Sequence, residues 1–154
     1  MSNETTLVLI KPDALARGLA GAVLTRLEQL GLDLVGAKVM RVSRQLAEEH
    51  YKALRAKPFF NDLIRHLRGE LHGVDYVLAF VYAGPGAIAK VRALAGATNP
   101  EQAELMSLRG SLGRMTTKGI MENVLHASSD AQEAECEIPL WFRPEELLAP
   151  LSTR

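Results

Sequence analysis

The segment ENVLHASSD, residues 122–130, contains the side chain of this chain that is best suited to covalent chemistry. His126 ends a short apolar run and is followed closely by Ser128 and Ser129. Its ring could pack in the core with a hydroxyl as partner, or it could act as a nucleophile. An imidazole attacks well only when one ring nitrogen is free and the other is held. The nucleophile interpretation therefore requires an acid beside the ring.

Two glutamates could supply this acid. Glu133 and Glu137 are four residues apart, which places both on one face of the helix expected after the histidine. Either could fold back beside His126, with Ser128 as an intermediary. An exposed acidic helix face would have the same spacing, so both interpretations stay open.

The other three histidines, His50, His66 and His72, are expected to be solvated. His50 and His66 lie in charged helical segments, and His72 lies in a loop with two glycines. No two histidines have the i, i+4 spacing of a helical metal site, and we expect the single cysteine, Cys136, to be an unreactive packed residue. The sequence therefore predicts no zinc site.

Three cationic side chains could form a local phosphate site. Lys11 ends a β-rich run, Arg92 lies in a helical segment, and Arg109 precedes GSLG. The planar guanidinium group of arginine matches phosphate oxygens, and two such groups with a lysine would balance the charge of a nucleotide tail. Each residue alone is equally compatible with an ordinary solvated cation.

Composition limits the class of protein. The length of 154 residues fits a single domain, residues 1–154, and the net charge of zero argues against stable nucleic-acid binding. The apolar runs are shorter than the ~20 residues of a membrane span, so we expect no membrane association. The N-terminus has no signal-peptide pattern, and one cysteine fits a reducing compartment. A cytoplasmic location is expected.

Hydrophobic periodicity and turn residues predict an α+β fold. Strands are expected at residues 6–11, 32–43, 76–84 and 123–127, and helices at 20–31, 45–56, 59–67 and 86–96. A last helix is expected to begin with Ser129 as N-cap, and residues 97–119 are expected to be mostly irregular. This order is the ferredoxin-like βαββαβ arrangement, in which helices cover one face of a four-stranded antiparallel sheet.

Seven segments carry a family resemblance that covers residues 6–147. They are IKPDALARG, HY, KPFF, GATNP, LRG, NVLHAS and EIPLWFRPEEL. In this order and near these spacings they resemble the nucleoside diphosphate kinase family. The resemblance implies a ping-pong phosphotransferase, in which a nucleoside triphosphate such as ATP donates its γ-phosphoryl group to a histidine. The phosphohistidine then transfers that group to a nucleoside diphosphate.

The resemblance also implies a role for each matched residue. His126 corresponds to the nucleophile, and Glu137 and Ser128 to the residues that hold its ring. Lys11 and Tyr51 correspond to the pair at the transferred phosphate. The remaining matches are the clamp on the other phosphates, the ribose-contacting asparagine and the ring that stacks on the base: Arg92, Thr98, Arg109, Asn123 and Phe59. Mg²⁺ is expected as the cofactor, bound through the nucleotide phosphates and not by protein ligands. Stacking on one aromatic ring predicts low base selectivity.

The resemblance further implies a homo-oligomer built from dimers, with tetramer and hexamer both open. Two stretches depart from the family pattern. The segment 110–122 is longer than usual and has Met121 and Glu122 where a Gly-Arg pair is common, and GELHGVDY, residues 69–76, is also extended. Arg114 and Lys118 could replace the lost arginine or be solvated. A nucleotide-binding sensor without turnover and a regulatory module for another small anion stay as alternatives, because one architecture hosts many functions.

Overall fold

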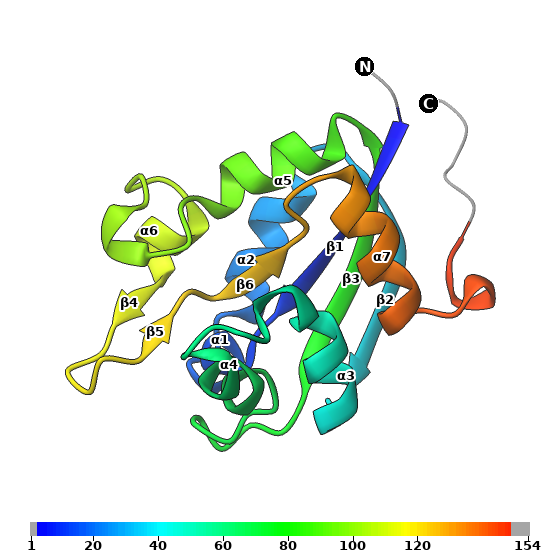
Figure 1. Cartoon of the computed structure of the whole chain (residues 1–154). Coiled ribbons are helices and arrows are strands. Elements are labelled where there is room, and N and C mark those ends of the chain that lie inside the picture. The colour runs from blue at the N-terminus through cyan, green and yellow to red at the C-terminus, as the bar shows by residue number, and fades with distance from the viewer. Residues whose placement is uncertain (1–2, 149–154) are drawn as a thin grey trace.

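A computed structural model describes residues 3–148 of the chain. Its centre is a four-stranded antiparallel sheet with the strand order β2-β3-β1-β6 (Figure 1). The strands of this sheet are β1 (Asn3–Ile10), β2 (Asp33–Met40), β3 (Val77–Pro85) and β6 (Leu125–Ala127). The α+β, ferredoxin-like prediction is confirmed, and all four predicted strands are present.

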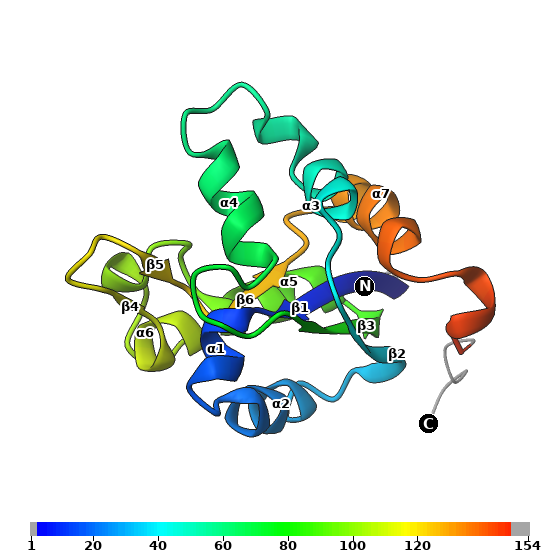
Figure 2. The same cartoon turned by 90° about the horizontal axis from the view of Figure 1, so that it is seen from below.

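Helices lie on both sides of this sheet. They are α1 (Pro12–Ala16), α2 (Ala20–Glu28), α3 (Arg44–His50), α4 (Phe60–Leu67), α5 (Ala87–Ala95), α6 (Leu108–Leu112) and α7 (Ala131–Trp141). Figure 2 shows α3, α4 and α7 on one side, and α1 and α2 on the other. Short 3-10 turns occur at Lys52–Leu54, Pro100–Gln102 and Pro144–Glu146. None of the helices within 3–148 is long and apolar enough to cross a membrane.

The central strand β1 is buried on both faces. Leu7 and Leu9 pack with Trp141 of α7, whereas Val8 and Ile10 belong to the opposite core, which includes α2 and α5. The prediction that helices cover one face only is therefore wrong. The continuous apolar run from Leu7 to Ile10 is the physical reason, because such a run is typical of a strand with no solvated face. Each of these side chains stabilises the fold by about 1.5–3 kcal/mol through burial.

The helix expected at residues 45–56 ends early. It stops at His50, and Tyr51 separates it from the 3-10 turn at Lys52–Leu54. The side chain of His50 is buried against Trp141, and this tertiary contact outweighs the helical propensity of the charged residues that follow. His50 and Tyr51 are thereby brought beside the end of β6.

The segment 97–119 is more regular than predicted. It contains α6, whose N-cap Ser107 accepts a hydrogen bond from the amide of Gly110 at 3.0 Å. A short hairpin follows, formed by β4 (Arg114–Met115) and β5 (Met121–Glu122). A Cβ atom at Gly110 would lie 1.9 Å from the carbonyl oxygen of Glu104, so this position in LRG requires glycine.

Helix α7 begins one residue later than predicted. Its N-cap is Asp130 and not Ser129, because Asp130 Oδ1 accepts a hydrogen bond from the amide of Glu133 at 2.8 Å. The carboxylate of Glu133 in turn accepts from the amide of Ser129 at 2.6 Å. The side chain of Glu133 is therefore engaged at the helix N-terminus.

Candidate functional site

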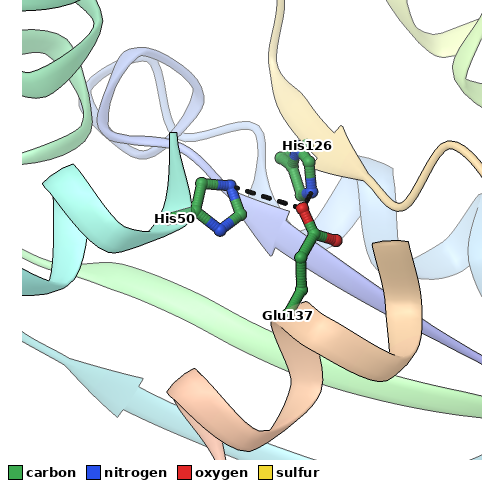
Figure 3. Close-up of side chains that lie close together, drawn as sticks. All are labelled: His50, His126 and Glu137. Atoms are coloured by element: carbon green, nitrogen blue, oxygen red, sulfur yellow. Dashed lines mark ion pairs between the residues drawn. The ribbon is translucent and has the colours of Figure 1, made fainter. Parts of the chain in front are cut away.

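His126 lies on the edge strand β6, opposite Leu9 of β1. Its side chain is 17% exposed. The following turn leads into α7, which returns over the sheet and brings Glu137 to the ring (Figure 3). The edge of the sheet and the first turns of α7 therefore form the two walls around the imidazole.

A buried chain of polar groups holds one side of this ring. Oε2 of Glu137 lies 2.8 Å from Nε2 of His126, and Oε1 accepts a hydrogen bond from the hydroxyl of Ser128 at 2.7 Å. Ser128 is fully buried and accepts from the amide of Leu7 at 3.1 Å. The carboxylate favours the proton on Nε2, which leaves the lone pair on Nδ1. Of the two acids that the sequence left open, Glu137 is the one beside the ring.

His50 is a third member of this cluster, and the prediction that it is solvated is wrong. Its side chain is fully buried, and its ring lies edge-on to that of His126 at a centroid distance of 4.5 Å. The indole N–H of Trp141 donates to Nδ1 of His50 at 3.1 Å. Nε2 of His50 faces Oε2 of Glu137 at 3.8 Å, as the dashed line in Figure 3 marks.

The cluster of His50, His126 and Glu137 brings three possible metal-ligating atoms within 4.8 Å of one another. The hydrogen bond from Trp141 to Nδ1 of His50, however, places the proton of the neutral ring on Nε2. That nitrogen has no lone pair for a metal. In this cluster Oε2 of Glu137 lies between the Nε2 atoms of His50 and His126, at 3.8 Å and 2.8 Å.

The electrostatic surroundings keep His126 neutral. Burial, together with the cations Lys11, Arg109 and Arg92, lowers the pKa of His126 to about 3 against the opposing effect of Glu133. Burial likewise lowers the pKa of His50 to about 3. At neutral pH the ring of His126 is therefore uncharged, which is the form in which an imidazole attacks an electrophile.

Lys11 and Asn123 form a buried pair beside the histidine. Nζ of Lys11 donates to Oδ1 of Asn123 at 2.6 Å, and the side-chain amide of Asn123 donates to the carbonyl of Thr98 at 3.1 Å. Burial lowers the pKa of Lys11 to about 8; Asp13 opposes this shift and Arg109 adds to it. The lysine is thus a desolvated cation that is held in one direction.

Arg109 is buried and supports the backbone of the site. Its guanidinium donates to the carbonyls of Asn123 at 3.2 Å, Gly96 at 2.9 Å and Leu125 at 2.8 Å. Because arginine has five N–H groups, two remain for a ligand after these three bonds. Burial and the nearby charge of Arg92 lower the pKa of Arg109 to about 10.

The backbone between Asn123 and Leu125 is strained. Val124 has a φ of 75°, and the amide of Leu125 donates to the carbonyl of Asn123 at 2.8 Å, which closes a γ-turn. For a β-branched residue this conformation costs about 1–3 kcal/mol and persists only when its surroundings hold it. The amide of Val124 donates to Asp13 Oδ2 at 2.9 Å, and its carbonyl accepts from the amide of Lys11 at 3.0 Å.

The remaining predicted residues lie around this centre. Tyr51 is half-buried with its ring 4.7 Å from that of His50, and burial raises its pKa, so the phenol keeps its proton. Arg92 and Thr98 are exposed; Thr98 meets Asn123 through its carbonyl. Phe59 precedes α4 and is 47% exposed, outside the buried cluster.

The predictions for three further residues, His66, His72 and Cys136, are corrected. His66 and His72 are not solvated, because Nε2 of His66 lies 2.9 Å from Asp13 Oδ1 and Nε2 of His72 lies 3.0 Å from Glu122 Oε1. Cys136 is exposed and not packed. Arg114, for which two alternatives were open, forms an ion pair with Glu122, and its side chain is 54% exposed. The sequence did not single out Asp13 or Val124, although the KPD motif contains the former.

Comparison with known proteins identifies the family. The sequence profile described as nucleoside diphosphate kinase matches residues 4–147 of the chain. The chain belongs to the nucleoside diphosphate kinase family. The family resemblance inferred from the seven sequence segments is thereby confirmed.

Individual members of the family match over most of their length. A nucleoside diphosphate kinase of Thermus thermophilus is 46% identical over 145 residues, which are 94% of this chain and 99% of the relative. That of Pyrococcus horikoshii is 44% identical over 144 residues, which are 94% of this chain and 88% of the relative. These relatives and the profile bear out the predicted activity, that of a nucleoside diphosphate kinase.

Solved structures of nucleoside diphosphate kinases have the same fold. The Borrelia burgdorferi enzyme, described as a transition-state mimic with bound vanadate and ADP, has a TM-score of 0.87 at 34% identity, covering 99% of this chain and 93% of the other. The Halobacterium salinarum enzyme in complex with CDP has a TM-score of 0.85 at 38% identity, covering 96% and 93%. The departures at residues 69–76 and 110–122 therefore leave the overall fold unchanged.

Proposed function

We propose that His126 is the nucleophile of a ping-pong nucleoside diphosphate kinase reaction. In the first half, the lone pair of Nδ1 attacks the γ-phosphorus of a nucleoside triphosphate such as ATP. The P–O bond to the β-phosphate breaks, and the nucleoside diphosphate leaves with that electron pair. In the second half, a terminal phosphate oxygen of another nucleoside diphosphate attacks the phosphohistidine, and the ring recovers its lone pair. One observation carries the proposal: Glu137 is 2.8 Å from Nε2 of a ring with strongly lowered pKa.

We propose that Glu137 and Ser128 hold the ring during both halves. Phosphorylation at Nδ1 increases the positive charge on the imidazole, and the carboxylate 2.8 Å from Nε2 stabilises that charge. The bond from Ser128 at 2.7 Å fixes the carboxylate in turn. Positioning of this kind is the main contribution that a protein makes to phosphoryl transfer.

The cations around the ring are proposed to bind the phosphates. Lys11 and the phenol of Tyr51 would contact the transferred group, and Arg92, Thr98 and Arg109 the remaining phosphates. The two N–H groups that Arg109 retains support this assignment. Neutralisation of phosphate charge by the buried cations Lys11 and Arg109 stabilises the transition state more strongly than in water.

The nucleoside is proposed to bind outside the buried cluster. The ring of Phe59 is 47% exposed and presents a surface on which a base can stack. Asn123, together with Lys11, would contact the ribose. Because each base has a π-face, stacking supports low base selectivity among nucleoside di- and triphosphates.

Mg²⁺ is proposed as the cofactor, carried by the nucleotide. Within residues 3–148 the one group of three metal-ligating side chains is His50, His126 and Glu137, in which neutral His50 carries its proton on Nε2 and offers no lone pair there. The cationic side chains Lys11, Arg92 and Arg109 fit phosphate oxygens, and Mg²⁺ takes such oxygens and waters as ligands. When bound, the ion would supply further positive charge at the phosphates.

The chain is further proposed to act as one domain, residues 1–154, in a cytoplasmic homo-oligomer built from dimers, tetramer or hexamer. Association through the edge strand β2 is supported by its exposed apolar side chains Leu34 and Val39, because exposed apolar edge strands favour pairing. A balanced net charge supports the absence of stable nucleic-acid binding.

Labelling with γ-³²P-ATP and Mg²⁺ tests the proposed function. We expect an acid-labile, base-stable phosphate on the wild-type protein that GDP or UDP discharges. The label should be absent from His126→Ala and present in Ser129→Ala, whose exposed side chain lies three residues away. A wild-type protein that binds ADP but takes up no label would instead be a nucleotide sensor.

A further inference from the structure

Two histidines outside the cluster of His126 meet beside the strained turn. The rings of His66, on α4, and His72, in the loop that follows, have a centroid distance of 5.0 Å. Figures 1 and 2 both show α4 beside the hairpin of β4 and β5. Their contacts with Asp13 and Glu122 place the two rings beside the segment that carries Asn123 and Val124, although more than 50 residues separate them from it in the sequence.

His66 holds the acid that fixes one side of the turn. Asp13 is fully buried; its Oδ2 accepts the amide of Val124 at 2.9 Å, and its Oδ1 faces Nε2 of His66 at 2.9 Å. The hydrogen bond from His66 lowers the pKa of Asp13 although burial opposes this. A buried carboxylate without its second partner would be strongly disfavoured, so His66 is needed for Asp13 to hold Val124.

His72 holds the acid on the other side. Glu122, directly before Asn123, is 4% exposed; its Oε1 faces Nε2 of His72 at 3.0 Å, and its Oε2 pairs with Arg114. His72 itself is largely buried. Both neighbours of Asn123 are thus tied through a carboxylate to a histidine.

We propose that His66 and His72 are positioning residues for phosphoryl transfer, which through Asp13 and Glu122 hold the strained turn that presents Asn123 to Lys11. Glu122 and His72 lie in the two stretches where the sequence departs from the family pattern. The departures therefore supply each other with a partner: the extended loop at residues 69–76 provides the histidine for the glutamate of the altered hairpin. The inference rests on the proposed function, because it concerns the rate of the same reaction.

A change in the conformation of the turn should change the pKa of Lys11. Lys11 is desolvated where its Nζ meets Asn123, and its backbone amide holds Val124. If the turn relaxes, water reaches the ammonium group and the pKa of Lys11 rises towards its ordinary value. The titratable and charged groups that act on this lysine or are acted on by it are Asp13, His50, His66, Arg109 and His126.

The test compares His72→Leu with His72→Gln, and His66→Leu with His66→Gln. Glutamine keeps an N–H donor towards the carboxylate, whereas leucine removes it. We expect each leucine variant to lower kcat/KM about tenfold, as loss of a hydrogen bond to a buried charge does, and to shift the alkaline limb of the pH–rate profile upwards. The glutamine variants should keep kcat/KM and the alkaline limb close to those of the wild-type protein. Arg41→Ala, which breaks the exposed pair with Asp75, is the matched control and should leave both unchanged.

The outcomes separate this inference from the proposed function. A wild-type protein without a phosphohistidine overturns the proposed function itself. A labelled wild-type protein whose leucine variants lose thermal stability but keep kcat, KM and the pH limb shows a merely structural role and overturns the inference. Should His72→Leu fail to fold, Glu122→Gln tests the same link, because it weakens the bond to His72 from the hairpin side and should show the same shift of the limb.

Discussion

The Nζ atom of Lys11 lies 2.6 Å from Oδ1 of Asn123, within a buried pair that joins the end of β1 to the strained turn before β6. This pair links the cation proposed to contact the transferred phosphate with the amide proposed to contact the ribose. Because the pair is buried, the pKa of Lys11 is lowered to about 8.

The alkaline limb of the pH–rate profile should reflect the deprotonation of Lys11. Because burial lowers the pKa of Lys11 to about 8, the side chain is charged below that pH and neutral above it. We expect kcat/KM to fall as the pH rises through about 8, with the loss of one proton. In Lys11→Gln the rate should be low and without this limb; a variant that keeps the limb would show that another group titrates there.

Loss of the charge at Glu137 should slow phosphoryl transfer to His126 but leave the affinity for nucleotide nearly unchanged. In Glu137→Gln the amide no longer stabilises the growing charge on the imidazole, so we expect phosphohistidine formation to slow by about tenfold to a hundredfold. The dissociation constant of ADP should change little, since the carboxylate is engaged with the ring of His126, 2.8 Å from its Nε2. Single-turnover labelling and calorimetry measure the two quantities. A large loss of ADP affinity would indicate a structural role.

Phe59→Ala should weaken the binding of all nucleotides to a similar degree. Stacking of a base on an aromatic ring contributes about 1–3 kcal/mol, so we expect KM to rise about fivefold to a hundredfold for purine and pyrimidine substrates alike. The side chain is 47% exposed, and thermal stability should be nearly unchanged. Steady-state kinetics with ADP, GDP and CDP would contradict the stacking role if KM stayed constant.

Gly110→Ala should destabilise the fold near Arg109. The added Cβ would lie 1.9 Å from the carbonyl oxygen of Glu104, and relief of that clash must move backbone, at about 1–3 kcal/mol. Gly21→Ala is the matched control, since nothing lies within 4 Å of its Cβ position in α2, and we expect it to stabilise by about 0.5–1 kcal/mol. Thermal unfolding of both variants measures the difference.

Local sequence patterns were sufficient for the main strands, whereas beside His126 they left Glu133 and Glu137 open and the family resemblance indicated Glu137. His126, Ser128 and Glu137 lie within twelve residues of one another, so a strand followed by a helix already brings them close. The cap of that helix was misplaced by one residue, because Ser129 and Asp130 are both good N-caps. Local patterns therefore placed the start of α7 to within one residue.

Long-range partners were not predictable in this way. His66 and His72 occur in charged or glycine-rich stretches, and only the fold brings them to Asp13 and Glu122. The same is true of His50, whose partner Trp141 is 91 residues away. The order within residues 97–119 was also missed, since its helix and hairpin have only two to five residues each and carry no periodic signal. In each case a tertiary contact overrides the local pattern.

The hydroxyl of Ser128 joins the carboxylate of Glu137 to the main chain of β1. The amide of Leu7 donates to this hydroxyl, and the carbonyl of Leu7 accepts from the amide of Ser128 at 3.1 Å. The backbone of Leu7, in a central strand of the sheet, is thus linked to Glu137 by hydrogen bonds through Ser128. The nitrogen and amide-proton resonances of Leu7 should respond each time the imidazole gains or loses its phosphoryl group, so an NMR signal from the core follows the reaction cycle.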